Sequence, residues 1–349
     1  MAILTLIKYF FRFVYLITKT NFKGIRFSRT DTVVWVRVWN FRFFFLDEFV
    51  NAFALINSLS NCDEKFNIYF GKSIGRYYGV RIFFPYSKHY NVFKFNNYTK
   101  SLVDVCEQLE AQGCSVYPKS NEVIYWENKG FMHQQFDVLG VPCPKTHLLP
   151  SVDEIDEIQI QYPVLLKEEH SFSSLGLYKI NSRQELESVA NQEYFNRNKC
   201  LIIQQLLNIR RDLRVIFIGD KIVHYYWRIN QSDEWRPTAT SYGNDVDFVF
   251  FPEQWRQFLI DVFLKFNLTT GAFDVAWEND DLTQTPMILE VSPYYQPNPA
   301  IDSKKVRMTY GEYKKGFLLR DSYDQKYVDI VFKIVQQQIS FLKMLNCLE

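Results

Sequence analysis

The stretch GAFDVAWENDDLTQTPMILEVSPYYQPNP, residues 271–299, decides the fold, because it has the pattern of two short strands joined by a polar connection. Side chains of a strand alternate between its two faces, so Asp274 and Glu290 each lie on one face of their own strand. A hairpin symmetric about Leu282 places Asp274 directly across from Glu290. Two carboxylates about 4 Å apart repel by about 4 kcal/mol at an effective dielectric constant of 20. The pattern therefore favours a cation between them.

The ligand types indicate which cation this would be. Two carboxylates offer only oxygen ligands, which favour Mg²⁺ or Mn²⁺ over Zn²⁺. The alternative is a surface hairpin in a different register, with the two acids solvated separately. The hairpin alone leaves both interpretations open.

The composition sets broad limits. A chain of 349 residues can form two or three domains, each with its own core. The net charge of +1 argues against nucleic acid as a partner. The six cysteines form no CxxC pair, which is typical of reduced thiols in a cytoplasmic protein.

Residues 1–30 are basic and contain no acidic residue. Lys8 and Arg12 interrupt the apolar run, so we predict neither a membrane-spanning helix nor a signal peptide. Apolar residues recur at helical spacing and predict a basic amphipathic helix. This helix would either rest on the inner face of an anionic membrane or pack on the body of the protein. The apolar residues are Leu4, Ile7, Phe11 and Val14.

The pattern from residue 31 to residue 120 alternates strands and helices, which predicts a small α/β domain with a mainly parallel sheet. Further on, prolines mark a linker after a helix at 128–139, and an apolar stripe predicts a terminal helix at 323–345 that packs on the body or on a partner subunit of a homodimer. The segments of the first domain are the strands VVWVRVW (33–39), FNIYFG (66–71) and VRIFF (80–84) and the helices 46–59 and 98–112.

A second hairpin is predicted around Gly219 and Asp220, which form a two-residue turn between apolar strands. The ideal register of that turn puts Asp212 and Arg214 on the face of Tyr225 and Trp227, with Arg228 on the opposite face. Arg228 then either is a structural residue or reaches the other face through a bend or bulge.

Four segments in this order resemble the core of an ATP-grasp ligase: YPVLLKEEHSFSSLGLYKI, CLIIQQLLNIRRDLRVIFIGDKIV, WRPTAT and GAFDVAW with MILEVSP. The resemblance is to the ribosomal-protein glutamate ligase and glutathione-synthetase-like branch, over residues 121–300. It implies an α/β (α+β) fold in which an N-terminal α/β domain precedes two α+β subdomains that clasp ATP. The implied division is a basic segment (1–30), an N-terminal domain (31–120), a central subdomain (121–203), a C-terminal subdomain (204–320) and a terminal helix (321–349).

The resemblance also implies how ATP is bound. Lysines contact phosphates, a serine-rich loop closes over the β- and γ-phosphates, a hinge binds adenine and an acid takes the ribose hydroxyls. The loop has a single glycine where the family usually has two or three. The alternative to phosphate contact is that the lysines are solvated residues at strand ends. The alternative to adenine binding is that the hinge residues form a strand buried in the core. The lysines are Lys129 and Lys167, and the loop residues are Ser171, Ser173, Ser174 and Gly176. The hinge residues are Gln204, Gln205 and Leu206, and the acid is Asp212.

Two arginines and three oxygen ligands complete the implied site. Arg228 and Arg236 match positions that contact the transferring phosphate or acyl phosphate. Asp274 and Glu290 match the acidic metal ligands, but Ser292 stands where the family usually has asparagine. Serine is a weaker ligand, so the metal would rely on water or on Asn298.

The implied function is that of an ATP-dependent carboxylate–amine ligase. A carboxylate would attack ATP to form an acyl phosphate, and an amine would displace phosphate to give an amide, with ADP and phosphate released. The alternatives are a different phosphoryl acceptor or a nucleotide-binding scaffold without turnover. The sequence identifies neither substrate, and amino acids, peptides and glycan precursors all remain open.

Overall fold

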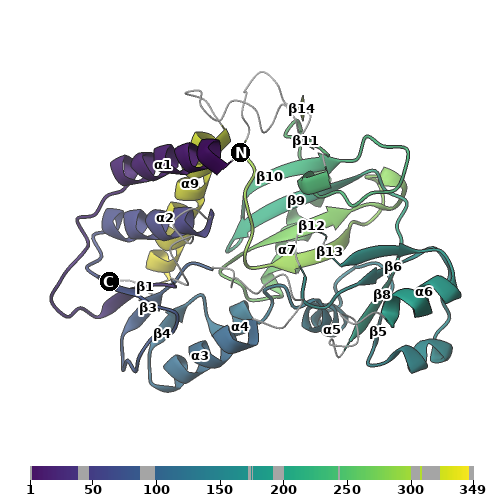
Figure 1. Cartoon of the computed structure of the whole chain (residues 1–349), viewed down its shortest axis with the longest axis horizontal. Coiled ribbons are helices and arrows are strands. Elements are labelled where there is room, and N and C mark those ends of the chain that lie inside the picture. The colour runs from purple at the N-terminus through teal and green to yellow at the C-terminus, as the bar shows by residue number, and fades with distance from the viewer. Residues whose placement is uncertain are drawn as a thin grey trace.

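A computed structural model describes residues 2–37, 47–86, 99–171, 174, 176–191, 200–242, 244–299, 307–308 and 323–345. Three sheets divide the molecule (Figure 1). None of the helices in these ranges has the length and apolar character needed to cross a membrane.

The first sheet is parallel, as the sequence predicts, and has the order β2-β1-β3-β4. Its central strand β1 is buried at every position because both faces of the sheet are covered. Helix α3 packs on one face, and the left-handed Gly113 (φ 79°) follows its last turn. The elements are β1 (Thr32–Val36), β2 (Asn67–Phe70), β3 (Arg81–Phe83), α3 (Thr99–Ala111) and β4 (Ser115–Tyr117).

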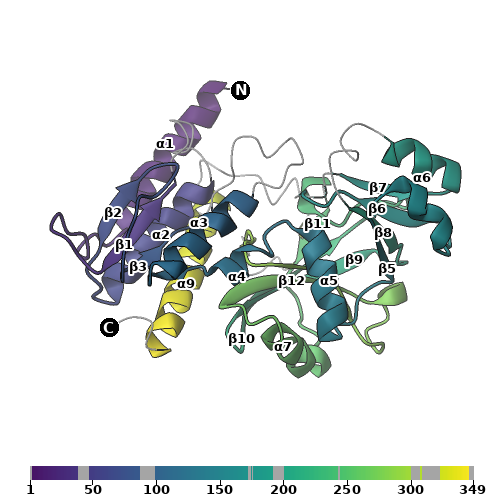
Figure 2. The same cartoon turned by 90° about the horizontal axis from the view of Figure 1, so that it is seen from below.

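Three helices from the two ends of the chain share one core on the other face of this sheet (Figures 1 and 2). They are α1 (Ala2–Lys19), α2 (Asp47–Asn61) and α9 (Tyr323–Met344). Leu16 of α1 is buried in that core, and the ring of Phe13 stacks on that of Phe49 at 6.1 Å. The second half of α1 therefore packs on the body. Helix α9 likewise packs on the body of its own chain. This was one of the two predicted positions, the other being a partner subunit.

The central sheet is antiparallel, with the order β5-β8-β6-β7. Helix α6 covers it, and an apolar cluster that includes Leu166 and Leu186 fills the space between them. The elements are β5 (Thr146–Leu149), β6 (Val164–Lys167), β7 (Leu177–Ile180), α6 (Arg183–Ala190) and β8 (Leu201–Gln205).

The third sheet has the order β13-β12-β9-β10-β11-β14, and α5 and α7 lie against it (Figure 2). Helix α5 begins after Asn128, whose side chain accepts a hydrogen bond from the backbone N–H of Phe131, and ends at the left-handed Gly140. The apolar side of α5 therefore packs against the six-stranded sheet, although α5 precedes the central sheet in the chain. The elements are α5 (Lys129–Leu139), β9 (Arg211–Ile218), β10 (Lys221–Ile229), β11 (Asp245–Asp247), α7 (Arg256–Leu264), β12 (Thr270–Ala276), β13 (Met287–Ser292) and β14 (Arg307–Met308).

The register of the β9–β10 hairpin corrects the sequence-based expectation. The turn at Gly219 is as predicted, but a bulge between Ile222 and His224 inserts one extra residue in β10. Arg228 therefore pairs with Asp212, and it is Tyr226 that pairs with Arg214. The ideal register, which put Arg228 on the face away from Asp212, was wrong, and the alternative prediction of a bend or bulge that brings Arg228 to the face of Asp212 is confirmed.

Candidate active site

A cavity of about 480 Å³ lies between the central sheet and the six-stranded sheet. Its walls come from the end of β6, the connection after β8, the β9–β10 hairpin with the loop that follows it, and the β12–β13 hairpin. The predicted site residues among its lining are Lys167, Ser174, Gln204, Gln205, Leu206, Asp212, Arg228, Arg236, Asp274, Glu290 and Ser292.

Gln204 and Gln205 are the last residues of β8, and Leu206 begins the segment that leads from the central sheet to the six-stranded sheet. Gln204 is buried, and its amide donates to the hydroxyl of Thr146 at 2.9 Å. The backbone N–H of Gln205 donates to Lys145 O at 2.8 Å, while the Gln205 side chain is largely exposed. The buried glutamine is therefore satisfied within the sheet. Gln205 and Leu206 expose polar and apolar groups to the cavity.

Lys167 stands at the end of β6 and borders the cavity near Glu290. Burial lowers the pKa of Lys167 to about 8, and the charge of Glu290 opposes that shift. Lys129 has a different environment. Its Nζ donates to the backbone oxygen of Ser171 and, at 3.2 Å, to the Ser171 hydroxyl, so it anchors the start of the loop instead of lining the cavity.

The loop between β6 and β7 is described at Ser171, Ser174 and Gly176, whereas Ser173 lies outside the described residues. Ser171 is buried and donates to Glu168 O at 3.1 Å. Ser174 has a left-handed backbone (φ 58°), and so has Gly176 (φ 67°). A serine thus occupies a backbone conformation that glycine adopts more readily. This explains how the loop turns with only one glycine.

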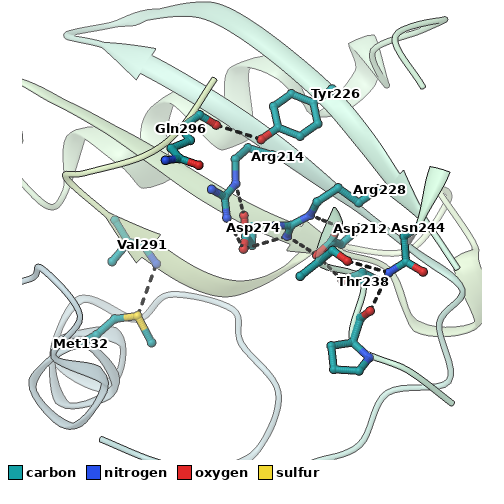
Figure 3. Close-up of polar contacts among 12 residues, drawn as sticks. Met132, Asp212, Arg214, Tyr226, Arg228, Thr238, Asn244, Asp274, Val291 and Gln296 are labelled. Atoms are coloured by element: carbon teal, nitrogen blue, oxygen red, sulfur yellow. Dashed lines mark hydrogen bonds and ion pairs between the residues drawn. The ribbon is translucent and has the colours of Figure 1, made fainter. Parts of the chain in front are cut away.

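Asp274 and Glu290 are direct cross-strand partners, as the sequence predicts. The carboxylate of Asp274 already has cationic partners: Arg214 donates to both of its oxygens, at 2.6 and 2.7 Å, and Arg228 donates at 2.8 Å (Figure 3). Burial alone would raise the pKa of Asp274, but the two arginines hold it well below its usual range. Asp274 is therefore a carboxylate that stays ionised inside the protein.

Asp212 faces Arg228 from the neighbouring strand (Figure 3). Both of its oxygens accept from the Arg228 guanidinium, one of them at 2.7 Å, and the Thr238 hydroxyl donates at 2.7 Å. Asp212 is 1% exposed, and burial raises its pKa against the effect of Arg228. A ribose-binding role for Asp212 stays a prediction, and it would require this carboxylate to share its oxygens.

The remaining predicted residues border the same space. Arg236 is exposed and lines the cavity. Asn244 holds the neighbouring loop by donating to Pro237 O at 2.6 Å and to Ala239 O at 3.1 Å. Ser292 donates its hydroxyl to Tyr294 O at 2.6 Å. Asn298, the alternative ligand, also lines the cavity.

The oxygen donors suit a hard divalent cation only in part. Asp274, Glu290, Ser292 and Asn298 border one cavity and offer only oxygen atoms, as Mg²⁺ prefers. Within the described ranges, however, no three His, Cys, Asp or Glu side chains gather closely enough to hold a metal. Glu290 is the best placed ligand, and Asp274 would have to share its oxygens with Arg214 and Arg228.

Arg214 and Thr238 are site residues that the sequence reasoning missed. Arg214 follows Asp212 by two positions and so shares its face of β9, a signal that was present in the sequence. Thr238 lies in a loop, where no periodicity predicts which way a side chain points.

Comparisons with known proteins show which fold this chain has. The structure is similar to that of the ATP-grasp ligase PsnB complexed with precursor peptide PsnA2 and AMPPNP (TM-score 0.53, 12% identity, 90% of this chain and 100% of that chain). It is also similar to D-alanine–D-alanine ligase from Bacillus anthracis complexed with ATP (0.52, 10%, 89% and 100%). A third is the RimK domain protein ATP-grasp from Sphaerobacter thermophilus DSM 20745 (0.51, 12%, 74% and 89%). The protein thus has the ATP-grasp fold.

The family model of the RimK-like ATP-grasp domain matches residues 131–295. This matched segment contains both sheets that border the cavity except for the strand β14. A comparison with curated protein sequences finds no match.

Proposed function

We propose that this chain is an ATP-dependent carboxylate–amine ligase that forms an amide through an acyl phosphate and releases ADP and phosphate. One observation carries the proposal: residues predicted from four separate segments line a single cavity between the two sheets of the RimK-like domain. A strand-end lysine, two arginines and a cross-strand carboxylate pair around one cavity suit a nucleoside triphosphate with its divalent cation.

The cavity can divide ATP between its two ends. Gln205 and Leu206 offer the adenine a polar edge and an apolar surface, and Asp212 stays our candidate for the ribose. Lys167 supplies positive charge toward Glu290 and Asp274, where the γ-phosphate would lie. Ser171, Ser173, Ser174 and Gly176 remain candidates for the loop over the phosphates, with Lys129 holding its start.

Arginines supply the charge for phosphoryl transfer. Arg228 is fixed by Asp212 and Asp274, so its guanidinium is oriented before any substrate arrives. Arg236 is exposed and can move onto a bound phosphate. A planar guanidinium forms two parallel hydrogen bonds to phosphate or carboxylate oxygens and keeps its charge. We therefore assign both arginines to the acyl phosphate and its transition state.

Mg²⁺ or Mn²⁺ would be held by Glu290, with Asp274, Ser292 or Asn298 as further ligands, and would neutralise phosphate charge. The structure of PsnB complexed with minimal precursor, Mg and ADP supports this assignment by its fold. Ser292 is the weakest candidate, because its hydroxyl already donates to Tyr294 O.

The substrates follow only in part from the comparisons. One similar structure contains a precursor peptide, and another is that of a D-alanine–D-alanine ligase. An amino-acid or peptide substrate is therefore our first choice, and a glycan precursor is the second. The five described cysteines are all free, which supports a cytoplasmic location.

A nucleotide-binding scaffold is the second candidate, and a specific observation favours it. Asp274 is occupied by two arginines and Ser292 by a backbone carbonyl, which leaves Glu290 as the metal ligand with the fewest competing contacts. Isothermal titration with ATP, followed by ADP assay with mixed carboxylates and amines, separates the two. Binding with no ADP release across the panel favours the scaffold.

Alanine substitution tests the ligase assignment. Asp274→Ala and Glu290→Ala should each lower ADP release at least a hundredfold, because each removes a carboxylate that would hold the Mg²⁺ balancing the charge of the transferring phosphate. Asp245→Ala is the matched control, since this buried acid lies in β11 of the same sheet but outside the cavity. Wild-type rates in both site variants would show that the carboxylate assignment is wrong.

A further inference from the structure

Helix α1 carries an apolar stripe on the side that faces away from the core. Phe10 is 61% exposed, Phe11 59%, Val14 40% and Ile17 43%. At 100° per residue they cover an arc of about 120°. Leu16 lies on the other side of the helix and is 1% exposed in the core with α2 and α9. Figure 2 shows α1 projecting from the body, with the chain's N-terminal end at its tip.

Single exposed apolar residues are common on protein surfaces, but several on one helix face mark an interaction site. The stripe leaves three large side chains and one medium one in contact with water along two turns of helix. Within the described ranges, none of the other elements covers it. The stripe is therefore available to a partner.

The charge around α1 indicates the chemistry of that partner. Residues 1–30 contain six basic residues and no acidic residue, whereas the whole chain carries only +1. The remaining 319 residues consequently carry −5. Lys23 and Arg29 are exposed just after the helix. Lys19 is different, because it forms an ion pair with Asp329 of α9 and its charge is compensated.

We propose that the stripe formed by Phe10, Phe11, Val14 and Ile17 docks on the surface of an anionic membrane. The aromatic and aliphatic side chains would enter the boundary between headgroups and acyl chains, while Lys23 and Arg29 contact acidic headgroups. The helix would lie along the surface, because no described helix can span a bilayer. The negative charge of the remaining chain disfavours contact through other faces and so sets the orientation.

A second copy of the chain is the other conceivable occupant, and its charge argues against it. A two-fold symmetric contact through α1 would place side by side two segments that contain no acidic residue and in which Lys23 and Arg29 are exposed, although Lys19 is compensated by Asp329. Acidic lipid headgroups complement the same charge. The membrane is therefore the occupant that fits both the apolar stripe and the basic residues.

Vesicle flotation of the full chain tests this proposal. We expect the wild type to float with vesicles of phosphatidylcholine containing 30% phosphatidylglycerol at low ionic strength, and with pure phosphatidylcholine at least tenfold less. Phe10→Ser/Phe11→Ser should remove most of the bound fraction. Lys23→Glu/Arg29→Glu should weaken binding about fivefold or more for each cation lost.

Two control variants match these changes elsewhere on the surface. Val249→Ser/Leu264→Ser removes two apolar side chains that are 56% and 50% exposed, and Arg76→Glu/Lys221→Glu reverses two exposed cations. Both controls should float as the wild type does. Circular dichroism and thermal unfolding confirm that each variant is folded.

Two results would overturn the proposal. One is a wild type that fails to float with anionic vesicles, or that floats equally well after Phe10→Ser/Phe11→Ser. The other is a wild-type dimer in light scattering that this variant dissociates, since the occupant would then be a second copy. ATP binding by the variants is independent of either outcome.

Discussion

The buried pair of Asp212 and Arg228 determines how the site is held before substrates bind. Asp212 is 1% exposed and Arg228 8% exposed, so neither charge is stabilised much by water. Breaking such a pair leaves an uncompensated buried charge and costs about 3–5 kcal/mol, whereas replacing both partners with apolar residues is often nearly neutral. The pair is therefore important mainly for orienting Arg228.

This asymmetry gives a stability prediction. Arg228→Met should lower the free energy of unfolding by about 3–5 kcal/mol, and Asp212→Leu/Arg228→Met should recover most of that loss. Urea unfolding of the three proteins measures it. If the double variant were less stable than Arg228→Met, the prediction would be wrong. The unpaired charge of Asp212 would then not be the cause of the lost stability.

Arg214 would compete with a metal ion for Asp274. It donates to both carboxylate oxygens, at 2.6 and 2.7 Å, and hydrogen bonds to charged groups contribute about 1.5–3 kcal/mol each. Arg214→Met should therefore raise the affinity for Mn²⁺ without nucleotide by about tenfold. Electron paramagnetic resonance of free Mn²⁺ measures this. Arg211→Met on the same strand is the control, and equal affinities in both variants would exclude competition at Asp274.

We expect ATP binding to depend on pH through Lys167. Burial lowers its pKa to about 8, so in metal-free buffer its positive charge is present below pH 8 and is lost above it. The dissociation constant of ATP should rise by up to about tenfold per pH unit above pH 8, where the γ-phosphate of ATP is already ionised. Lys167→Arg should remove this rise, since arginine keeps its charge. A flat wild-type curve from calorimetry would show that Lys167 is not a phosphate contact.

At the scale of elements, the turn between β9 and β10 packs tightly against α9. Gly219 has φ 55°, and a Cβ there would lie 2.5 Å from the Phe341 ring. Gly113 has φ 79° and open space around it. We expect Gly113→Ala to cost about 1 kcal/mol from backbone strain alone. Gly219→Ala should cost about 1–3 kcal/mol more, because it also overpacks the contact with α9. Equal losses in thermal unfolding would mean that Phe341 moves aside freely.

The same hairpin shows which parts of an element the sequence determines. Gly219 predicted the position of the turn, because few residues adopt its left-handed backbone. The bulge after Ile222 has no residue signal, since neither Val223 nor His224 is special for a bulge. That bulge places Arg228 beside Asp212. The pairing of Asp274 with Glu290, in contrast, was predicted from a symmetric hairpin, although a register shift between Asp274 and Val275 interrupts that symmetry nearer the turn.

At the scale of the whole molecule, the fold followed from the order of motifs, but its contacts did not. The sequence predicted the parallel first sheet, the two clasping subdomains and the terminal helix. It did not predict that α5 shares a core with the six-stranded sheet, or that α9 joins α1 and α2. Such contacts depend on which apolar faces meet across long stretches of chain, and periodicity identifies only that a face is apolar.

The cavity between the two subdomains is the central feature of the molecule. It combines Lys167 from the central sheet with Arg228, Asp274 and Glu290 from the six-stranded sheet. Phosphoryl transfer depends on positioning these charges around a phosphate, so activity should be lost when either side is altered. This property would distinguish the ligase from a protein that only binds nucleotide.

Hydroxylamine trapping tests this account most directly, because it replaces the unknown amine and converts an acyl phosphate into a hydroxamate. The wild type should be incubated with ATP, Mg²⁺, hydroxylamine and a panel of amino acids, peptides and glycan-precursor acids. We predict ADP and a hydroxamate in equal amounts with at least one acid, and loss of both in Lys167→Ala and Glu290→Ala. ATP binding without hydroxamate or ADP for every acid, or equal yields from wild type and both variants, would contradict the account.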